Sequence, residues 1–481
     1  MSMRTKILRA ALVAAALLLA ACGGSGSDSA APDDASPVVA VGAITGFGSV
    51  HVNGMRFETN GAVVTLDGQP GTEAQLRVGQ VVRIKGTRSG GSSDCHASSI
   101  DFDDAVQGPV ESVDAATGTL VVLGQGVQVD ELTSFDERFE PASLAGVAVG
   151  VIVEISGFRD AGGVIHATRI EPKDAGELFE VTGTVGNHDA AAKRFDIAAL
   201  TVDYSAAQLD DLPGGVPDNG LVVEVKGRTL DADGVLLATR VEGKRDDMDD
   251  DDDMEAEIEG MVTRFVSATD FEVSGRPVTT TSATRFENGS SADLALGVRV
   301  EVEGDIRDGV LVAEKVKFER ESDLRVSAQI DGIDTAAGTF SVLGITIQTN
   351  AGTRFEDKTD APVRPFDLAS LRVGDFVEVR GSPGSSPDSI AAARVEREDP
   401  EERIELRGIA EDVAQPQLTI LGVTVLTNAG TEFEGEGDED IGAADFFARA
   451  PGRLVSVDGQ LEGDVLVARE IELEGDDDID D

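Results

Sequence analysis

The sequence predicts an all-β protein made of six tandem, small five-stranded barrels behind an N-terminal signal segment. One strand pattern recurs six times, and its clearest copy is LRVGDFVEVRG at residues 371–381. In every copy Val or Ile alternates with polar residues, which is typical of a half-buried strand. Each copy ends on a glycine, and these glycines lie 70 to 78 residues apart, at Gly86, Gly157, Gly227, Gly304, Gly381 and Gly459.

Residues 1–21 are predicted to be a lipoprotein signal peptide. Basic residues precede an apolar run at 10–20 that is too short to span a bilayer as a stable anchor. The run leads into Leu19-Ala20-Ala21-Cys22, which resembles the lipobox of bacterial lipoproteins. The resemblance implies cleavage before Cys22 and lipidation of Cys22, so that acyl chains on this residue hold the protein to the membrane. An ordinary signal peptide with an incidental cysteine is the alternative.

Residues 22–37 follow as a flexible tether that is rich in Gly, Ser, Asp and Pro. Two glycines and no Asp come directly after Cys22, which in a Gram-negative bacterium resembles sorting to the outer membrane. We therefore expect a lipid-anchored protein of the bacterial cell envelope, at the outer membrane, on either its periplasmic or its surface side.

The repeat pattern divides the remaining chain into six β repeats, an acidic linker and an acidic tail. The repeats, numbered 1 to 6 from here on, span 38–104, 105–173, 178–244, 256–319, 325–398 and 404–474, with the linker at 245–255 and the tail at 475–481.

Each repeat is expected to contain three strands, a short helical segment and two more strands. Asn53-Gly54 is a strong hairpin signal between the first strands of repeat 1. Residues 366–371 and 291–296 have helical rather than strand spacing, and a Ser or Asp could cap one turn there. This order of elements is that of an OB-type barrel; a small sandwich or a meander barrel is the alternative. A closed barrel would also hide its sheet edges from neighbouring repeats.

A Thr-x-Phe motif follows the central hairpin in several repeats. Its phenylalanines are Phe135, Phe286, Phe355 and Phe433. We expect them to plug one end of a barrel rather than to serve as a ligand platform.

Together these motifs resemble an uncharacterised β domain of bacterial envelope proteins, of the type called domain of unknown function 5666. The shared pattern is Gly-x-Val, a Phe/Leu-x-Val-x-Gly hairpin, Thr-x-Phe, Leu-x-x-Gly-x-x-Val-x-Val-x-Gly and Ala-x-x-Ile/Val-Glu. The resemblance covers about residues 38–474 and implies tandem domains behind a lipoprotein signal. Its motifs are turns and core positions, so it carries over no catalytic residue.

Catalytic chemistry is thinly represented in the sequence. Cys95 is the only cysteine besides Cys22, and the histidines are His51, His96, His166 and His188. Cys95, His96 and His166 fall in strand patterns, so we expect them to pack rather than to react. We assign no catalytic, cofactor-binding or metal-binding residue. A net charge of −50 with 4% aromatic residues argues against nucleic-acid binding.

Two acidic runs are the main remaining feature, at 246–253 and at 475–481. A solvated linker and tail explain them. Weak Ca²⁺ binding is the sharper interpretation, because carboxylate oxygens are hard ligands; no EF-hand loop is present, so any such binding would be delocalised.

Three functional hypotheses follow. The first is a non-enzymatic binding or scaffold protein that presents its β modules as an extended arm to an unknown protein partner. The second is a divalent-cation-binding surface protein. The third is a hydrolase with an unrecognised carboxylate site, for which repeat 3, the most divergent copy, would be the place to look.

Overall fold

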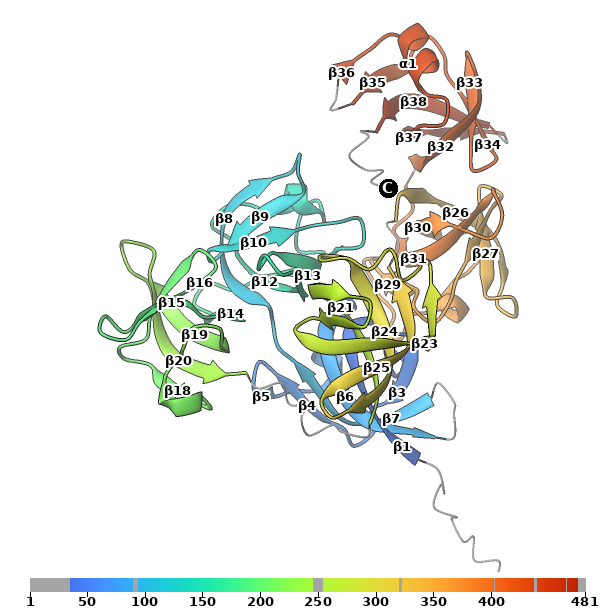
Figure 1. Cartoon of the computed structure of the whole chain (residues 1–481). Helices are drawn as coiled ribbons and strands as arrows, with labels where there is room; N and C mark the ends of the chain where they lie inside the picture. The colour runs from blue at the N-terminus through green and yellow to red at the C-terminus, as the bar shows by residue number, and fades with distance from the viewer. Residues whose placement is uncertain are drawn as a thin grey trace, which may run out of the picture.

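The computed structural model describes residues 35–89, 94–244, 254–319, 322–401, 403–436, 439–463 and 465–474 (Figure 1). Over these ranges the chain is all-β, as predicted, with a few 3₁₀ turns and one α-helix. No helix in them has the length and apolarity needed to cross a membrane. The predicted lipobox with Cys22 and both acidic runs lie outside these ranges.

The elements fall into the six repeats as follows. Repeat 1 has β1 (Ala35–Gly46), β2 (Val50–Val52), β3 (Met55–Glu58), β4 (Val63–Leu66), β5 (Gln69–Pro70), η1 (Glu73–Gln75), β6 (Val81–Ser89) and β7 (Asp94–Phe102). Repeat 2 has β8 (Val106–Asp114), β9 (Thr119–Val122), β10 (Gln125–Gln128), β11 (Ser134–Phe135), η2 (Leu144–Gly146), β12 (Ile152–Arg159) and β13 (Ile165–Lys173). Repeat 3 has β14 (Phe179–Thr184), β15 (Gly186–Asp189), β16 (Arg194–Ile197), β17 (Leu200–Asp203), β18 (Gln208–Asp210), η3 (Pro213–Gly215), β19 (Val222–Leu230) and β20 (Leu236–Gly243).

The second half of the chain repeats this order. Repeat 4 has β21 (Glu255–Ser267), β22 (Asp270–Val273), β23 (Arg276–Glu287), β24 (Arg299–Arg307) and β25 (Val310–Phe318). Repeat 5 has β26 (Leu324–Asp334), β27 (Thr339–Val342), β28 (Ile345–Gln348), β29 (Arg354–Asp357), η5 (Leu368–Ser370), β30 (Phe376–Pro383) and β31 (Ser389–Glu398). Repeat 6 has β32 (Ile404–Ala414), β33 (Gln417–Ile420), β34 (Val423–Leu426), β35 (Glu432–Gly435), β36 (Glu439–Asp440), α1 (Ala443–Arg449), β37 (Leu454–Glu462) and β38 (Val465–Leu473).

The strands of a repeat pair in a ring, which repeat 4 shows most simply. β21 pairs with β22, β22 with β23, β23 with β25, β25 with β24 and β24 with β21, and only the β23–β25 pair is parallel. The same ring recurs in repeats 1, 2, 5 and 6. This is the strand order of an OB-type barrel, so the predicted fold is confirmed.

The glycine that ends each copy of the sixfold strand pattern lies at a β-bulge. In all six repeats the register between the fourth and fifth main strands shifts at this glycine. A Cβ on Gly304 would lie 2.1 Å from the backbone oxygen of Val312, and one on Gly381 would lie 2.2 Å from that of Ala391. Only glycine allows the two strands to approach so closely.

The Thr-x-Phe motif also has a structural role. The Thr353 hydroxyl donates a 2.7 Å hydrogen bond to the carbonyl of Ala392, and Thr133 does the same to Ala167 at 2.8 Å. Phe135 and Phe355 are buried, and Phe286 and Phe433 pack against their barrel cores as partly buried side chains. The motif therefore locks the third strand to the fifth and fills the core.

One of the two predicted helical turns is absent and the other is present. Residues 291–296 form turns without a helix. Before them, β23 is one long strand where repeats 2 and 5 have two short ones. At 366–371 the expected helical turn does form, and the Asp367 side chain accepts a 3.0 Å hydrogen bond from the Ser370 amide.

The barrels do not hide their edges from one another, contrary to expectation. The first strand of each repeat pairs with the first strand of another: β8 with β14, β26 with β32, and β1 with β21. This is possible because β1 meets β2 only from Ile44 onward, which leaves Val38–Val41 free to pair with a neighbour. The result is three two-barrel sheets, which join repeats 1 and 4, 2 and 3, and 5 and 6.

The expectation of an extended arm is also wrong. Repeats 1, 2, 4 and 5 contact one another, while repeats 3 and 6 lie at the periphery beside their sequence neighbours (Figure 1). The described chain is therefore a cluster of four barrels that carries two outlying ones.

Candidate functional site

Buried ion pairs fill the junction where repeats 1, 2, 4 and 5 meet. Arg169 on β13 is at its centre, with a guanidinium that is almost fully buried. One of its nitrogens lies 3.1 Å from the Val78 carbonyl in repeat 1 and 3.3 Å from the Glu356 carboxylate in repeat 5, and Arg169 also pairs with Glu171. Burial alone would raise the pKa of Glu356, but Lys358 and Arg169 outweigh it and hold this pKa below its usual value. This carboxylate is therefore a structural anion.

Three arginines of repeat 5 donate hydrogen bonds to a single loop of repeat 2, residues 131–133. Arg354 donates to the Leu132 carbonyl at 3.2 Å, and Arg394 donates to the Thr133 carbonyl at 2.9 Å. Arg380 bonds both the carbonyl and the carboxylate of Glu131, at 2.8 and 2.6 Å. A planar guanidinium with several donors suits such multiple contacts. The loop is thus held in place by another barrel.

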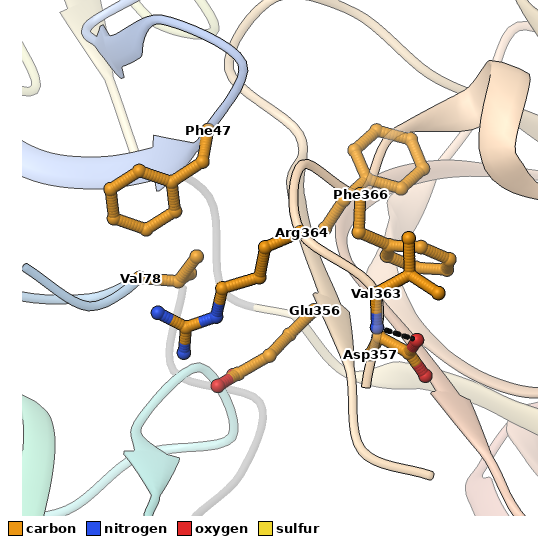
Figure 2. A pocket seen from close by; sticks show the side chains of 8 residues that line it. Phe47, Val78, Glu356, Asp357, Val363, Arg364 and Phe366 are labelled. Atoms are coloured by element: carbon orange, nitrogen blue, oxygen red, sulfur yellow. Dashed lines mark hydrogen bonds between the residues drawn. The ribbon is translucent and has the colours of Figure 1, made fainter. Parts of the chain in front are cut away.

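A hollow of about 350 Å³ opens beside this junction. Its lining is Arg77, Asp136, Glu137, Arg138, Arg169, Glu356, Asp357, Lys358, Pro362 and Arg364. Figure 2 shows the adjoining small cavity, in which the Arg364 guanidinium lies between the Phe47 ring of repeat 1 and the Glu356 carboxylate. Charges of both signs line the hollow in nearly equal number, so its lining is suited to ion pairing.

A second cluster lies where repeats 1, 2 and 3 meet. Asp67, Asp104 and Glu180 each place one carboxylate oxygen within 4.8 Å of the other two. Asp67 is in the turn between β4 and β5, Asp104 is in the connection from β7 to β8, and Glu180 is on β14. Burial, followed by repulsion from Asp67, raises the pKa of Asp104 well above its ordinary value.

The repeated barrels match a known protein family. The model of the family described as Domain of unknown function (DUF5666) matches residues 38–100, 107–171, 182–242, 259–317, 327–396 and 407–472. The chain belongs to this family. A search of curated proteins finds no match. The six DUF5666 repeats are the six barrels of the structure, which agrees with the predicted tandem domain.

The structure places the predicted packing residues only partly as expected. Cys95 is fully buried in the core of the first DUF5666 repeat, and burial raises the pKa of its thiol, which makes it inert. His96 is exposed instead, because Cys95 and Ala97 on either side face the core. His166 is also partly exposed, 3.4 Å from the Asp160 carboxylate. The prediction that His96 and His166 pack in the core was therefore wrong.

Sequence reasoning missed both charged clusters, although a signal for the first was present. The last strand has the pattern Ala-x-Arg-Ile/Val-Glu, and its Arg and Glu pair directly in Arg169–Glu171 and Arg394–Glu396. On an ordinary half-exposed strand such a pair is a solvated surface contact, and the packing of barrels buries it here. The carboxylate triad had no local signal, since Asp67 and Asp104 lie 37 positions apart in repeat 1 and Glu180 belongs to repeat 3.

Proposed function

We propose that this protein is a lipid-anchored, non-enzymatic scaffold of the bacterial cell envelope, held at the outer membrane through Cys22, whose β modules bind a protein partner. One observation carries the scaffold part. In the central junction the buried Arg169 and Glu356 pair with each other across barrels, and Arg380 of repeat 5 pairs with the more exposed Glu131 of repeat 2. Charges committed to holding modules together favour a rigid support over a catalytic surface.

The outlying barrels, repeats 3 and 6, are the surfaces on which we place the partner. Each uses its first strand to join the neighbouring repeat, through β14 and β32. The remaining strands of both barrels stay away from the central junction (Figure 1). A partner could therefore bind either barrel without disturbing the buried ion pairs.

The hydrolase alternative finds little support. It requires a clustered, buried carboxylate pair that one repeat has and the other five lack, whereas such pairs recur. Glu180 and Glu224 lie around Lys226 in repeat 3, at 2.5 and 3.4 Å. Glu257 and Glu301 lie around Lys315 in repeat 4, at 3.8 and 3.5 Å. Asp104 belongs to a junction and is too deeply buried to meet a polymeric substrate. The cation alternative has a specific observation in its favour, which the next subsection develops.

The anchor is tested by metabolic labelling with a fatty-acid analogue. The full-length protein and a Cys95→Ala control are expected to take up label and to sediment with membranes, while Cys22→Ser takes up none. Label in Cys22→Ser, or none in the unmodified protein, would refute lipidation at this residue.

The scaffold is tested by affinity purification of the lipidated protein from its native envelope, with and without a chelator. A single stoichiometric partner is expected under both conditions. Substitution of an exposed residue of repeat 6, Leu461→Asp, or of repeat 3, Leu237→Asp, identifies the barrel that holds it. A chain that brings down no partner, or that hydrolyses an envelope polymer, would overturn the scaffold proposal.

A further inference from the structure

We propose that Asp67, Asp104 and Glu180 bind a hard divalent cation, Ca²⁺ in first place, and that this ion fastens repeat 1 to repeat 3 at the point where repeat 2 begins. The site is separate from the two acidic runs and does not depend on the scaffold proposal. It would act inside the molecule, at a junction, rather than on its surface.

The backbone presents these carboxylates in a fixed arrangement. The Asp104 amide donates a 3.1 Å hydrogen bond to one Asp67 carboxylate oxygen, and the Asp67 amide donates to the Phe102 carbonyl at 2.9 Å. Glu180 is held opposite Gln107 by the pairing of β14 with β8. Oxygen ligands stand about 2.3–2.6 Å from Ca²⁺. Three oxygens within 4.8 Å of one another therefore fit around one ion.

Asp104 supplies an independent sign of a missing ligand. Asp104 is only 4% exposed to solvent, and its Oδ2 atom has no hydrogen-bond partner in the described structure. A buried carboxylate oxygen without a donor is costly, because the water it has lost is not replaced. A cation among the three carboxylates would satisfy this oxygen.

The carboxylates around the site outnumber the lysines, so a cation with a double positive charge would improve the charge balance there. Three lysines and six carboxylates face this junction, namely Lys173, Lys226, Lys244, Asp67, Asp103, Asp104, Glu154, Glu180 and Glu224. Lys173 pairs with Glu154, Lys244 pairs with Asp103 and Glu224, and Lys226 pairs with Glu180 and Glu224. Lys226 reaches the backbone carbonyl of Asp67 at 3.0 Å rather than its carboxylate. The Asp67–Asp104 pair is thus the uncompensated part of the cluster.

The ligand set selects the class of ion. All three side chains offer carboxylate oxygen, with no imidazole or thiolate among them, and oxygen ligands suit Ca²⁺, Mg²⁺ and Mn²⁺ rather than Zn²⁺. Ca²⁺ accepts irregular geometry and more ligands than Mg²⁺, so it suits a junction between three barrels better.

The experiment is calorimetric titration of the chelator-treated full-length chain with CaCl₂, MgCl₂ and MnCl₂, together with thermal melting at each ion. Asp104→Asn removes one ligand and also the buried charge, so it should fold at least as stably as the ion-free protein. A control variant with every Asp of 246–253 replaced by Ser removes the acidic run instead.

We expect one tight Ca²⁺ site in the unmodified chain and in the 246–253 variant, with affinity at least tenfold lower in Asp104→Asn. The melting transition of repeats 1 to 3 should rise by about 5–10 °C at a hundredfold excess of ion over Kd. Asp67→Asn serves as the second ligand variant should Asp104→Asn fail to fold. Binding that survives both ligand variants and disappears with the 246–253 variant, or no binding of any of the three ions, would overturn the proposal.

Discussion

The joint between repeats 1 and 4 differs from the joints that link repeats 2 and 3 and repeats 5 and 6. The latter two are antiparallel, connect neighbours in the chain, and each fuses the two barrels into one continuous hydrophobic core. The joint of repeats 1 and 4 is parallel, connects barrels far apart in sequence, and leaves two separate cores. The strand β1 serves both: Val38 and Ala40 face one core, and Val39 faces the other.

The difference teaches how an added barrel can be integrated. Sequence neighbours meet through a short connection and merge their cores at little entropic cost. Repeats that are distant in sequence share one strand. Each keeps its own core, and a different face of the shared strand packs into each core. Repeat 4 is therefore complete only when a strand more than two hundred residues earlier is in place, as the 3.0 Å bond from the Ala43 amide to Glu259 also shows.

The largest predicted effect comes from cutting the chain at these joints. A fragment of repeats 5 and 6, residues 322–474, should fold with one cooperative transition because its two barrels share a core. A fragment of repeat 4 alone, residues 254–319, should remain largely unfolded because it lacks the strand β1, which pairs with β21 and places Val39 in the core of repeat 4. Circular dichroism melting of both fragments checks this. A cooperative melt of isolated repeat 4 would remove the distinction between the joints.

A buried charge in the fused joint comes next. Val326 on β26 pairs with Leu406 on β32 and is fully buried in the shared core. Val326→Asp should destabilise repeats 5 and 6 together, by about 3–5 kcal/mol. Ile409→Asp, on the partly exposed face of β32, is the matched control and should change little. Denaturant unfolding measures both, and loss of repeat 5 alone would contradict a shared core.

The two kinds of joint should respond to pH in opposite directions. Burial and then repulsion from Glu301 raise the pKa of Glu257, at the joint of repeats 1 and 4, to about 9. Its protonated form is favoured in the fold, so this joint should lose stability as the pH rises from 4.5 toward 9. In repeat 5, Arg380 and Arg325 overcome burial and lower the pKa of Glu378 to about 2. That joint should lose stability as the pH falls from 4.5 toward 2.

Each of these groups can change the free energy of unfolding by at most about 1.4 kcal/mol per pH unit. Hydrogen exchange of β21 and β30 across pH separates the two responses. Glu257→Gln should abolish the alkaline loss in repeat 4 and leave the acid loss in repeat 5 untouched. A common pH profile for the two strands would show that these carboxylates do not control the joints.

The smallest effects concern the two faces of β1. Val38→Ala should lower the local stability of repeat 1, and Val39→Ala that of repeat 4, each by about 1–2 kcal/mol for the lost methyl groups. Exchange protection of β3 and of β25 reports the two barrels separately. If both variants weakened the same barrel, β1 would not divide its faces between them.

The sequence was sufficient for the fold within a repeat. The alternation around Val377 and Val379, the glycine at 381 and the Thr353-x-Phe355 motif each report a local constraint, and the structure shows that constraint as a strand, a bulge and a hydrogen bond. Such features repeat because each barrel needs the same backbone geometry.

The arrangement of barrels could not be read in the same way. Partners such as Arg169 and Glu356 lie 187 positions apart and obey no periodicity. One signal was available: Val38, Val39, Ala40 and Val41 are apolar on both faces of a strand, which is typical of a strand covered on both sides. The carboxylate triad lacks even that, because two aspartates and a glutamate are unremarkable in a chain with 90 acidic residues.

The shared strand β1 also determines how the molecule would bear mechanical load. It is the first described element, and it is hydrogen-bonded along its length to β6 on one side and over Val38–Val41 to β21 on the other. A force applied at its N-terminal end would act along the strand and across these bonds, so that they must shear together rather than peel off one at a time. A pull from this end is thus met by two barrels at once.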